Sequence, residues 1–175
     1  MSASFAAALL LGAACHSWAA EGKPVYATIG PFDVLGSGPN YLDAGAGLFN
    51  FYNKADKRSI AERIELRFGK KLAFVGPALG VFANGEGFRY GYAGIYADFC
   101  YKRFVLTPLF AAGVYHRGGS LDLGGPFEFR ESLEIAYRFD DRWQAGVSVA
   151  HISNAKIYRN NPGQQDLLLT IAGGF

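Results

Sequence analysis

The stretch from residue 127 to 139, FEFRESLEIAYRF, alternates apolar and charged or small side chains along almost its whole length. One set of alternate positions is apolar except at Glu131, and the other carries Arg130, Glu134 and Arg138 among its members. Successive side chains of a β-strand point to opposite sides, so a period of two indicates a strand with one apolar and one polar face.

Residues 60–68 repeat this arrangement. The even-numbered positions are apolar apart from Glu62, and between them stand Arg63, Glu65 and Arg67. We expect the charged faces of both segments to point towards the centre of a closed structure. There they would pair with one another as a structural polar plug rather than form an ion path.

Six further segments show the same alternation, which makes eight in all. Most are at least as long as the roughly 9–11 residues that a tilted strand needs to cross a bilayer. The eight segments cover residues 40–52, 59–69, 71–83, 87–99, 103–117, 127–139, 142–153 and 166–175. Tight turns at 69–71, 100–102 and 140–141 alternate with mostly longer connections at 53–58, 84–86, 118–126 and 154–165.

An even number of amphipathic strands, with short turns at one end and longer loops at the other, is typical of outer-membrane barrels. The pattern predicts an all-β fold, an eight-stranded antiparallel transmembrane β-barrel, closed because lipid cannot satisfy a free strand edge. The apolar C-terminal segment ending at Phe175 resembles the assembly signal of bacterial outer-membrane barrels. The alternative is a secreted soluble barrel of lipocalin type.

Composition agrees with a β-rich single domain. The 175 residues include 23 Gly, 15 Phe and 10 Tyr, and the net charge is only +2. This small charge gives no indication of a nucleic-acid-binding surface.

Residues 1–19 are predicted to be a signal peptide, which leaves residues 20–175 as the barrel. An apolar core about as long as that of a signal peptide, too short to span a bilayer, precedes small residues before a cut after Ala19. A lipid anchor on Cys15 is the alternative, although no bulky apolar residue stands three positions before it. Removal of the leader leaves Cys100 alone, so no disulfide can form within the mature chain.

Near the C-terminus, the segment VSVAHISN (residues 147–154) carries an unusual polar pair. By alternation His151 and Ser153 share a face with Val147 and Val149, which would face lipid. With both chain ends on the periplasmic side, the pair lies near the outer end of the seventh strand and points out of the barrel.

Such a pair suggests acyl transfer. An imidazole can take the proton of a serine hydroxyl and make it nucleophilic, and the amide of Asn154 is a candidate donor to the oxyanion. The substrate would be an ester dissolved in the outer leaflet. The alternative is a polar pair at the membrane rim without a catalytic task.

The sequence HISNA at 151–155, followed by NNPG at 160–163, resembles the signature of the lipid A 3-O-deacylase (PagL-type) family. The motif covers the last quarter of the chain, and the rest is similar in architecture only. The resemblance implies an outer-membrane serine esterase of a Gram-negative bacterium. It would remove an ester-linked acyl chain from lipid A of lipopolysaccharide without a metal cofactor. It also implies Ser153 as nucleophile, His151 as general base and Asn154 as oxyanion donor.

The chain departs from the family pattern at the acid. The family has a glutamate where Gln165 stands, and an amide can accept a hydrogen bond from the imidazole but cannot compensate its charge. Asp166 is adjacent, yet alternation turns it inward unless the loop before the last strand is irregular. A catalytically weak or inactive barrel with a structural or interaction role therefore remains the alternative function. A homodimer is left open.

Two other features are interpreted without catalytic roles. His116, near the outer end of the fifth strand, is expected to be an interface or interior residue, since nothing stands at metal-ligand spacing from it. The glycine-rich stretch at 30–40 lacks the strand–glycine–helix context of a nucleotide-binding loop, so turns are expected there.

Overall fold

A computed structural model describes residues 24–52 and 58–175 of the chain. The predicted signal peptide at residues 1–19, and most of the predicted connection at 53–58, lie outside these described residues. Within the described ranges no helix is long and apolar enough to cross a membrane.

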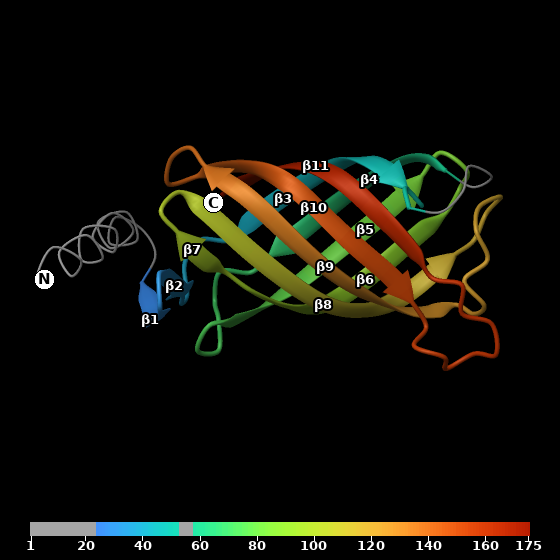
Figure 1. Ribbon diagram of the computed structural model, residues 1–175, viewed down its shortest axis with the longest axis horizontal. Coiled ribbons are helices and arrows are strands. Elements are labelled where there is room, and N and C mark those ends of the chain that lie inside the picture. Colours follow the sequence, from blue (N-terminus) through green and yellow to red (C-terminus); the bar gives the residue numbers. More distant parts are fainter. Residues whose placement is uncertain (1–23, 53–57) are drawn as a thin grey trace, which may run out of the picture.

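Eight long strands form a closed antiparallel barrel (Figure 1). They are β3 (Tyr41–Phe49), β4 (Ser59–Arg67), β5 (Val75–Asn84), β6 (Arg89–Ala97), β8 (Phe104–His116), β9 (Phe127–Arg138), β10 (Trp143–Ser153) and β11 (Gln164–Gly174). Neighbours in this order pair with one another, and β11 pairs with β3, so every long strand has two partners. The predicted eight-stranded barrel is confirmed, with strand bounds within a few residues of those expected.

Three short strands were missed. These are β1 (Val25–Ile29), β2 (Phe32–Leu35) and β7 (Phe99–Tyr101). β1 and β2 form a hairpin, which pairs through β2 with β7 beyond the end of the barrel that holds the C-terminus (Figure 1). The expectation of turns alone at residues 30–40 is therefore wrong. Strands of four or five residues are too short to show a clear period of two.

The two ends of the barrel differ, but less regularly than predicted, because the connection expected as a tight turn at 69–71 runs from residue 68 to 74. The end that carries the C-terminus has compact connections, such as the turn at Asp140 between β9 and β10. The backbone N–H groups of Trp143 and Arg142 donate to the Asp140 carboxylate and hold its pKa below its usual range. The other end carries connections 117–126 and 154–163, with a shorter one at 85–88 (Figure 1). Below, this is called the loop end.

The outer face of the barrel is apolar between the two rims. Exposed side chains on this face include Ile64, Val81, Leu79, Ile95, Leu133, Ile135, Val147, Leu169 and Ile171. Near the end that carries the C-terminus, called the turn end, exposed aromatic residues pack against one another. Ring centroids are 5.5 Å apart both for Phe104 and Tyr137 and for Tyr137 and Phe139. An apolar band bounded by aromatic residues is the surface that a transmembrane barrel presents to lipid.

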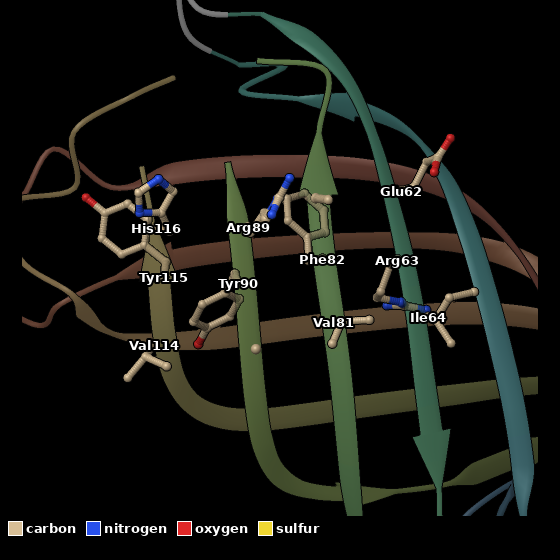
Figure 2. Close-up of a pocket in the computed structure, with 12 residues that line it drawn as sticks. Glu62, Arg63, Ile64, Val81, Phe82, Arg89, Tyr90, Val114, Tyr115 and His116 are labelled. Carbon is tan, nitrogen blue, oxygen red and sulfur yellow. The ribbon is translucent and has the colours of Figure 1, made fainter. Parts of the chain in front are cut away.

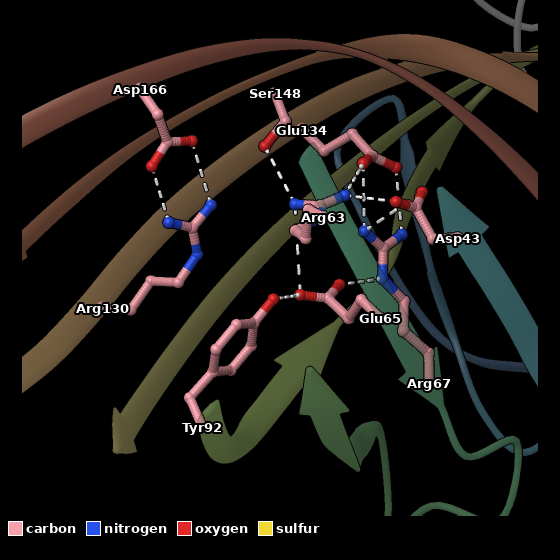
Figure 3. A network of polar contacts seen from close by, with 9 residues as sticks. All are labelled: Asp43, Arg63, Glu65, Arg67, Tyr92, Arg130, Glu134, Ser148 and Asp166. Atoms are coloured by element: carbon pink, nitrogen blue, oxygen red, sulfur yellow. Dashed lines mark hydrogen bonds and ion pairs between the residues drawn. The ribbon is translucent and has the colours of Figure 1, made fainter. Parts of the chain in front are cut away.

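The interior is filled by a network of ionic and polar side chains (Figure 3). Arg67 Nη1 and Nη2 each lie 3.0 Å from Glu134, and Arg63 contacts Asp43, Glu134 and Ser148. Tyr92 Oη donates to Glu65 over 2.6 Å. Because charges buried in a low-dielectric interior are stable only when paired and hydrogen-bonded, this network confirms the predicted polar plug.

Arg138 is the exception to that prediction. It is buried on the inner face as expected, but it forms no ion pair with any described residue. Towards the loop end, aromatic and aliphatic side chains replace the charges, with Phe49, Phe82 and Phe88 in mutual ring contact. The barrel therefore forms a solid scaffold, and its outward-facing residues are held by rigid strands.

Candidate active site

His151 and Ser153 lie at the loop end of β10 and point to the outer face. Their neighbours Ala150 and Ile152 are buried inside the barrel, with 6% and 0% exposure, while His151 and Ser153 are partly exposed. This is the orientation that alternation along the strand predicts. It places two potential acid–base and nucleophilic groups on the surface that meets lipid.

The strand register sets two polar neighbours beside His151. Gln165 on β11 lies directly across from it on one side, and Glu131 on β9 lies directly across on the other. Gln165 Nε2 is 3.2 Å from His151 Nδ1, a distance at which the two groups share a hydrogen bond. Glu131, which interrupts the apolar face of its strand, is exposed. In this polar row of Glu131, His151 and Gln165, the sequence predicted Gln165 beside His151, whereas Glu131 was missed, although its interruption of an apolar face was a visible signal.

Ser153 and His151 share a face but are not hydrogen-bonded to each other in the described structure. Ser153 lies across from Phe129 on β9, two pairs nearer the loop end than the polar row. Catalytic hydrogen bonds are often open in enzymes without substrate and close when it binds, so side-chain rotation would have to join the two groups.

Asn154 does not fit the role of oxyanion donor. Its side chain is fully buried, and its Nδ2 donates to the carbonyl oxygens of Leu123 (2.7 Å) and Asn160 (2.9 Å). Its Oδ1 accepts from the backbone N–H of Lys156, and its own N–H donates to Asn161. The amide has no hydrogen left for a substrate. Asn154 instead ties the β10–β11 loop to the β8–β9 loop.

The glycine of the NNPG motif has a geometric explanation. Gly163 has φ +64°, and a Cβ built on it would lie 2.7 Å from His151 Cε1. Any other residue would meet both a left-handed backbone and a clash with the imidazole. Gly163 therefore lets the loop pass directly beside the histidine ring.

Asp166 does not reach His151. It is fully buried on the inner face of β11, where its two carboxylate oxygens accept from Arg130 over 2.6 and 3.0 Å (Figure 3). The pairing of β10 with β11 runs without interruption from Trp143 to Ile152, so no irregularity turns Asp166 outward. Of the two candidates for the acid position, only Gln165 contacts the imidazole.

An apolar hollow of about 390 Å³ adjoins the polar row on the outer face. Leu133 and Val149 form its wall, and Glu131, His151 and Gln165 line it as well. Leu133 and Val149 lie directly across from each other and form the next outward-facing pair after the polar row, further into the apolar band. A hydrocarbon chain in this hollow would bring an ester at its head towards His151 and Ser153. The described residues include no group of three or more His, Cys, Asp or Glu placed to hold a metal ion.

Comparison with solved structures shows the same fold. The crystal structure of the outer membrane enzyme PagL is 16% identical and has a TM-score of 0.59, with 75% of this chain and 97% of that chain covered. Neisserial surface protein A (NspA) is 13% identical, with a TM-score of 0.55 and coverage of 78% and 97%. A de novo designed transmembrane β-barrel is 12% identical, with a TM-score of 0.52 and coverage of 79% and 97%. The curated protein sequences contain no match.

The apolar outer band and the closed barrel, together with the family match described next, define an integral outer-membrane protein of a Gram-negative bacterium. Residues 85–171 match the family model of the lipid A 3-O-deacylase, PagL. The chain belongs to the PagL-type lipid A 3-O-deacylase family. At the level of the family, an outer-membrane lipid A deacylase is thus supported, whereas a homodimer is not.

Proposed function

We propose that this protein is a serine esterase that hydrolyses the ester-linked 3-O acyl chain of lipid A in the outer leaflet. The observation that carries the proposal is the polar row on the outer face, with His151 between Gln165 and Glu131 and with Ser153 beside it. The adjoining apolar hollow supports a substrate with an acyl chain. The family match supports lipid A as that substrate.

In the proposed reaction, His151 Nε2 accepts the proton of Ser153 Oγ as the oxygen attacks the ester carbonyl carbon. The C–O bond of the ester breaks, and the departing sugar oxygen takes the proton from the imidazolium to become a hydroxyl. A water molecule, deprotonated by the same imidazole, then cleaves the acyl-serine and releases the fatty acid. Each step uses His151 first as a base and then as an acid.

The oxyanion needs a different donor from Asn154, and we assign it to the backbone N–H of Ala155. Ala155 is exposed, has φ +50°, and its N–H has no acceptor among the described residues. It stands two residues after Ser153, where the strand turns into the loop. Backbone N–H groups are common oxyanion donors, because they are fixed before the charge develops.

Two residues would share the work that one carboxylate performs in a triad. Gln165 holds the imidazole by a hydrogen bond at Nδ1, and Glu131 on the other side contributes a negative charge. Side chains directly across an antiparallel pair have Cβ atoms about 4.5–5.5 Å apart. Glu131 thus stabilises the imidazolium without touching it.

We expect Glu131→Gln to lower kcat about tenfold with little change in KM, because only the charged imidazolium of the transition state loses stabilisation. Glu131→Asp should keep part of the rate, since the charge remains. Asp141→Asn removes an exposed carboxylate at the opposite end of the barrel and should have no effect. Initial rates of acyl release from lipid A in membranes measure the change. Unaltered turnover in Glu131→Gln would remove Glu131 from the mechanism.

The proposed function is tested by mass spectrometry of lipid A from cells with and without the protein. We expect the protein to convert lipid A into a species that lacks one 3-O-linked acyl chain. Lipid A that stays unchanged when the barrel is correctly inserted would favour the alternative, a non-catalytic barrel with a structural or interaction role.

A further inference from the structure

A second and larger hollow lies on the outer face of the barrel, across β4, β5, β6 and β8 (Figure 2). Its volume is about 580 Å³. In the strand order, β5 stands four strands from β10 in either direction, so the hollow faces away from His151 and Ser153. The proposed esterase site does not use it.

The strand register arranges the lining in two rows. The row nearer the loop end consists of Glu62, Ala83, Arg89 and His116, which lie across from one another in turn. The next outward-facing row, further into the apolar band, consists of Ile64, Val81, Gly91 and Val114. The hollow therefore has a polar mouth at the rim and an apolar floor in the membrane.

Gly91 forms part of that floor, and the fold does not require a glycine there. A Cβ built on Gly91 meets no atom within 4 Å, and its φ is not positive. At Gly80, Gly94 and Gly113 a Cβ would come within 2.3 Å of another atom, so packing explains those glycines. Among the described glycines of the barrel strands, Gly91 is the one with open space around its missing side chain. A glycine inside a strand marks a place where a ligand can approach the backbone closely.

The mouth of the hollow presents hydrogen-bond donors that have no partner. Arg89 and His116 lie directly across from each other, both exposed, and neither side chain forms a hydrogen bond or ion pair with any residue that the structure describes. A guanidinium and an imidazole side by side do not stabilise each other strongly, but both can donate hydrogen bonds to one anion placed between them. Below them, Val81 and Val114 flank Gly91 with 60% and 62% exposure. A ligand that fits this hollow has an anionic group at the rim and a hydrocarbon chain that extends into the apolar band.

We propose that this hollow is a second, non-catalytic binding site for one molecule of lipid A. A phosphate of lipid A binds Arg89 and His116, and one acyl chain lies on Gly91 between Val81 and Val114. The loop end faces the outer leaflet, where lipid A rather than glycerophospholipid is the phosphate-bearing lipid. The site places a bound lipid on the face opposite the esterase site, so it does not depend on turnover.

The test counts lipid molecules on the purified barrel in detergent by native mass spectrometry. Ser153→Ala serves as the background so that the probe is not consumed, and bis-phosphorylated lipid A is the probe. We expect two bound lipids in this background and one after Gly91→Leu, which fills the floor. Arg89→Gln with His116→Gln should weaken the second binding step about five- to tenfold, because the Arg89 charge near a membrane surface contributes roughly 1 kcal/mol, a factor of about five, and the hydrogen bond from His116 is lost as well.

Two control variants make the same kinds of change, loss of a cation and gain of a leucine, away from the hollow. Lys70→Gln removes an exposed cation at the turn end, and Ala145→Leu adds an apolar side chain on the outer face of β10. Neither should alter the count. A count that is the same in Gly91→Leu as in the background overturns the site. Equal retention of phosphatidylglycerol or of dephosphorylated lipid A overturns the assignment to lipid A phosphate.

Discussion

Ser153→Ala is expected to reduce acyl release from lipid A by about 10³-fold or more, to the level of membranes without the protein. His151→Ala should cost as much, because nucleophile and base act as a unit and loss of either removes the same step. Both side chains are partly exposed on the outer face, outside the packed interior. The barrel should therefore remain closed, which the faster migration of unheated samples on gels would show.

Ile60→Ala is the control, because it truncates an exposed side chain near the loop end on β4, three strands from β10. It should retain full esterase activity. Mass spectrometry of lipid A from the same membranes gives the readout for all three variants. If Ser153→Ala or His151→Ala turns over at the parental rate, the pair on β10 is not the catalytic pair, and the interpretation as a serine esterase at this site fails.

Gln165→Glu is expected to raise kcat about tenfold or more. An amide can present either end to Nδ1 of His151: its N–H₂ donates to a bare Nδ1, or its oxygen accepts from Nδ1–H. Only the second arrangement leaves Nε2 without a proton and able to act as the base for Ser153. A carboxylate offers acceptors alone, so it selects that tautomer and also stabilises the imidazolium. In a serine protease triad the reverse change, from acid to amide, costs about 10⁴ in kcat.

Asp166→Asn tests whether Asp166, which lies inside the barrel, acts as the acid in place of Gln165. It leaves Arg130 buried without its partner, so we expect it to lower the free energy of unfolding by about 3–5 kcal/mol. In molecules that stay folded, turnover should be unchanged. The midpoint temperature at which the folded gel band disappears measures the first quantity, and acyl release the second. If Gln165→Glu brings no gain while folded Asp166→Asn is inactive, then Asp166 is the acid and the role given to Gln165 is wrong.

The sequence alone determined which face of each long strand is apolar, because alternation is a local property that any strand displays. From it followed the eight strands, the buried Arg63 and Glu134, and the outward direction of His151 and Ser153. The motif on β10 and in the following loop also sufficed to suggest the family. Each of these properties depends on residues that are close together in the chain.

The tertiary structure decided everything that depends on which residues meet across strands. Glu131 lies 20 positions before His151 in the sequence and Gln165 lies 14 after it, and only the register of three strands makes them neighbours. Asn154 carries the chemistry of an oxyanion donor, but two carbonyl groups from folded loops use its hydrogens. The open floor at Gly91 likewise exists because Val81 and Val114 flank it on adjacent strands. Register and loop contacts arise when the barrel closes, and alternation along a single strand carries no information about them.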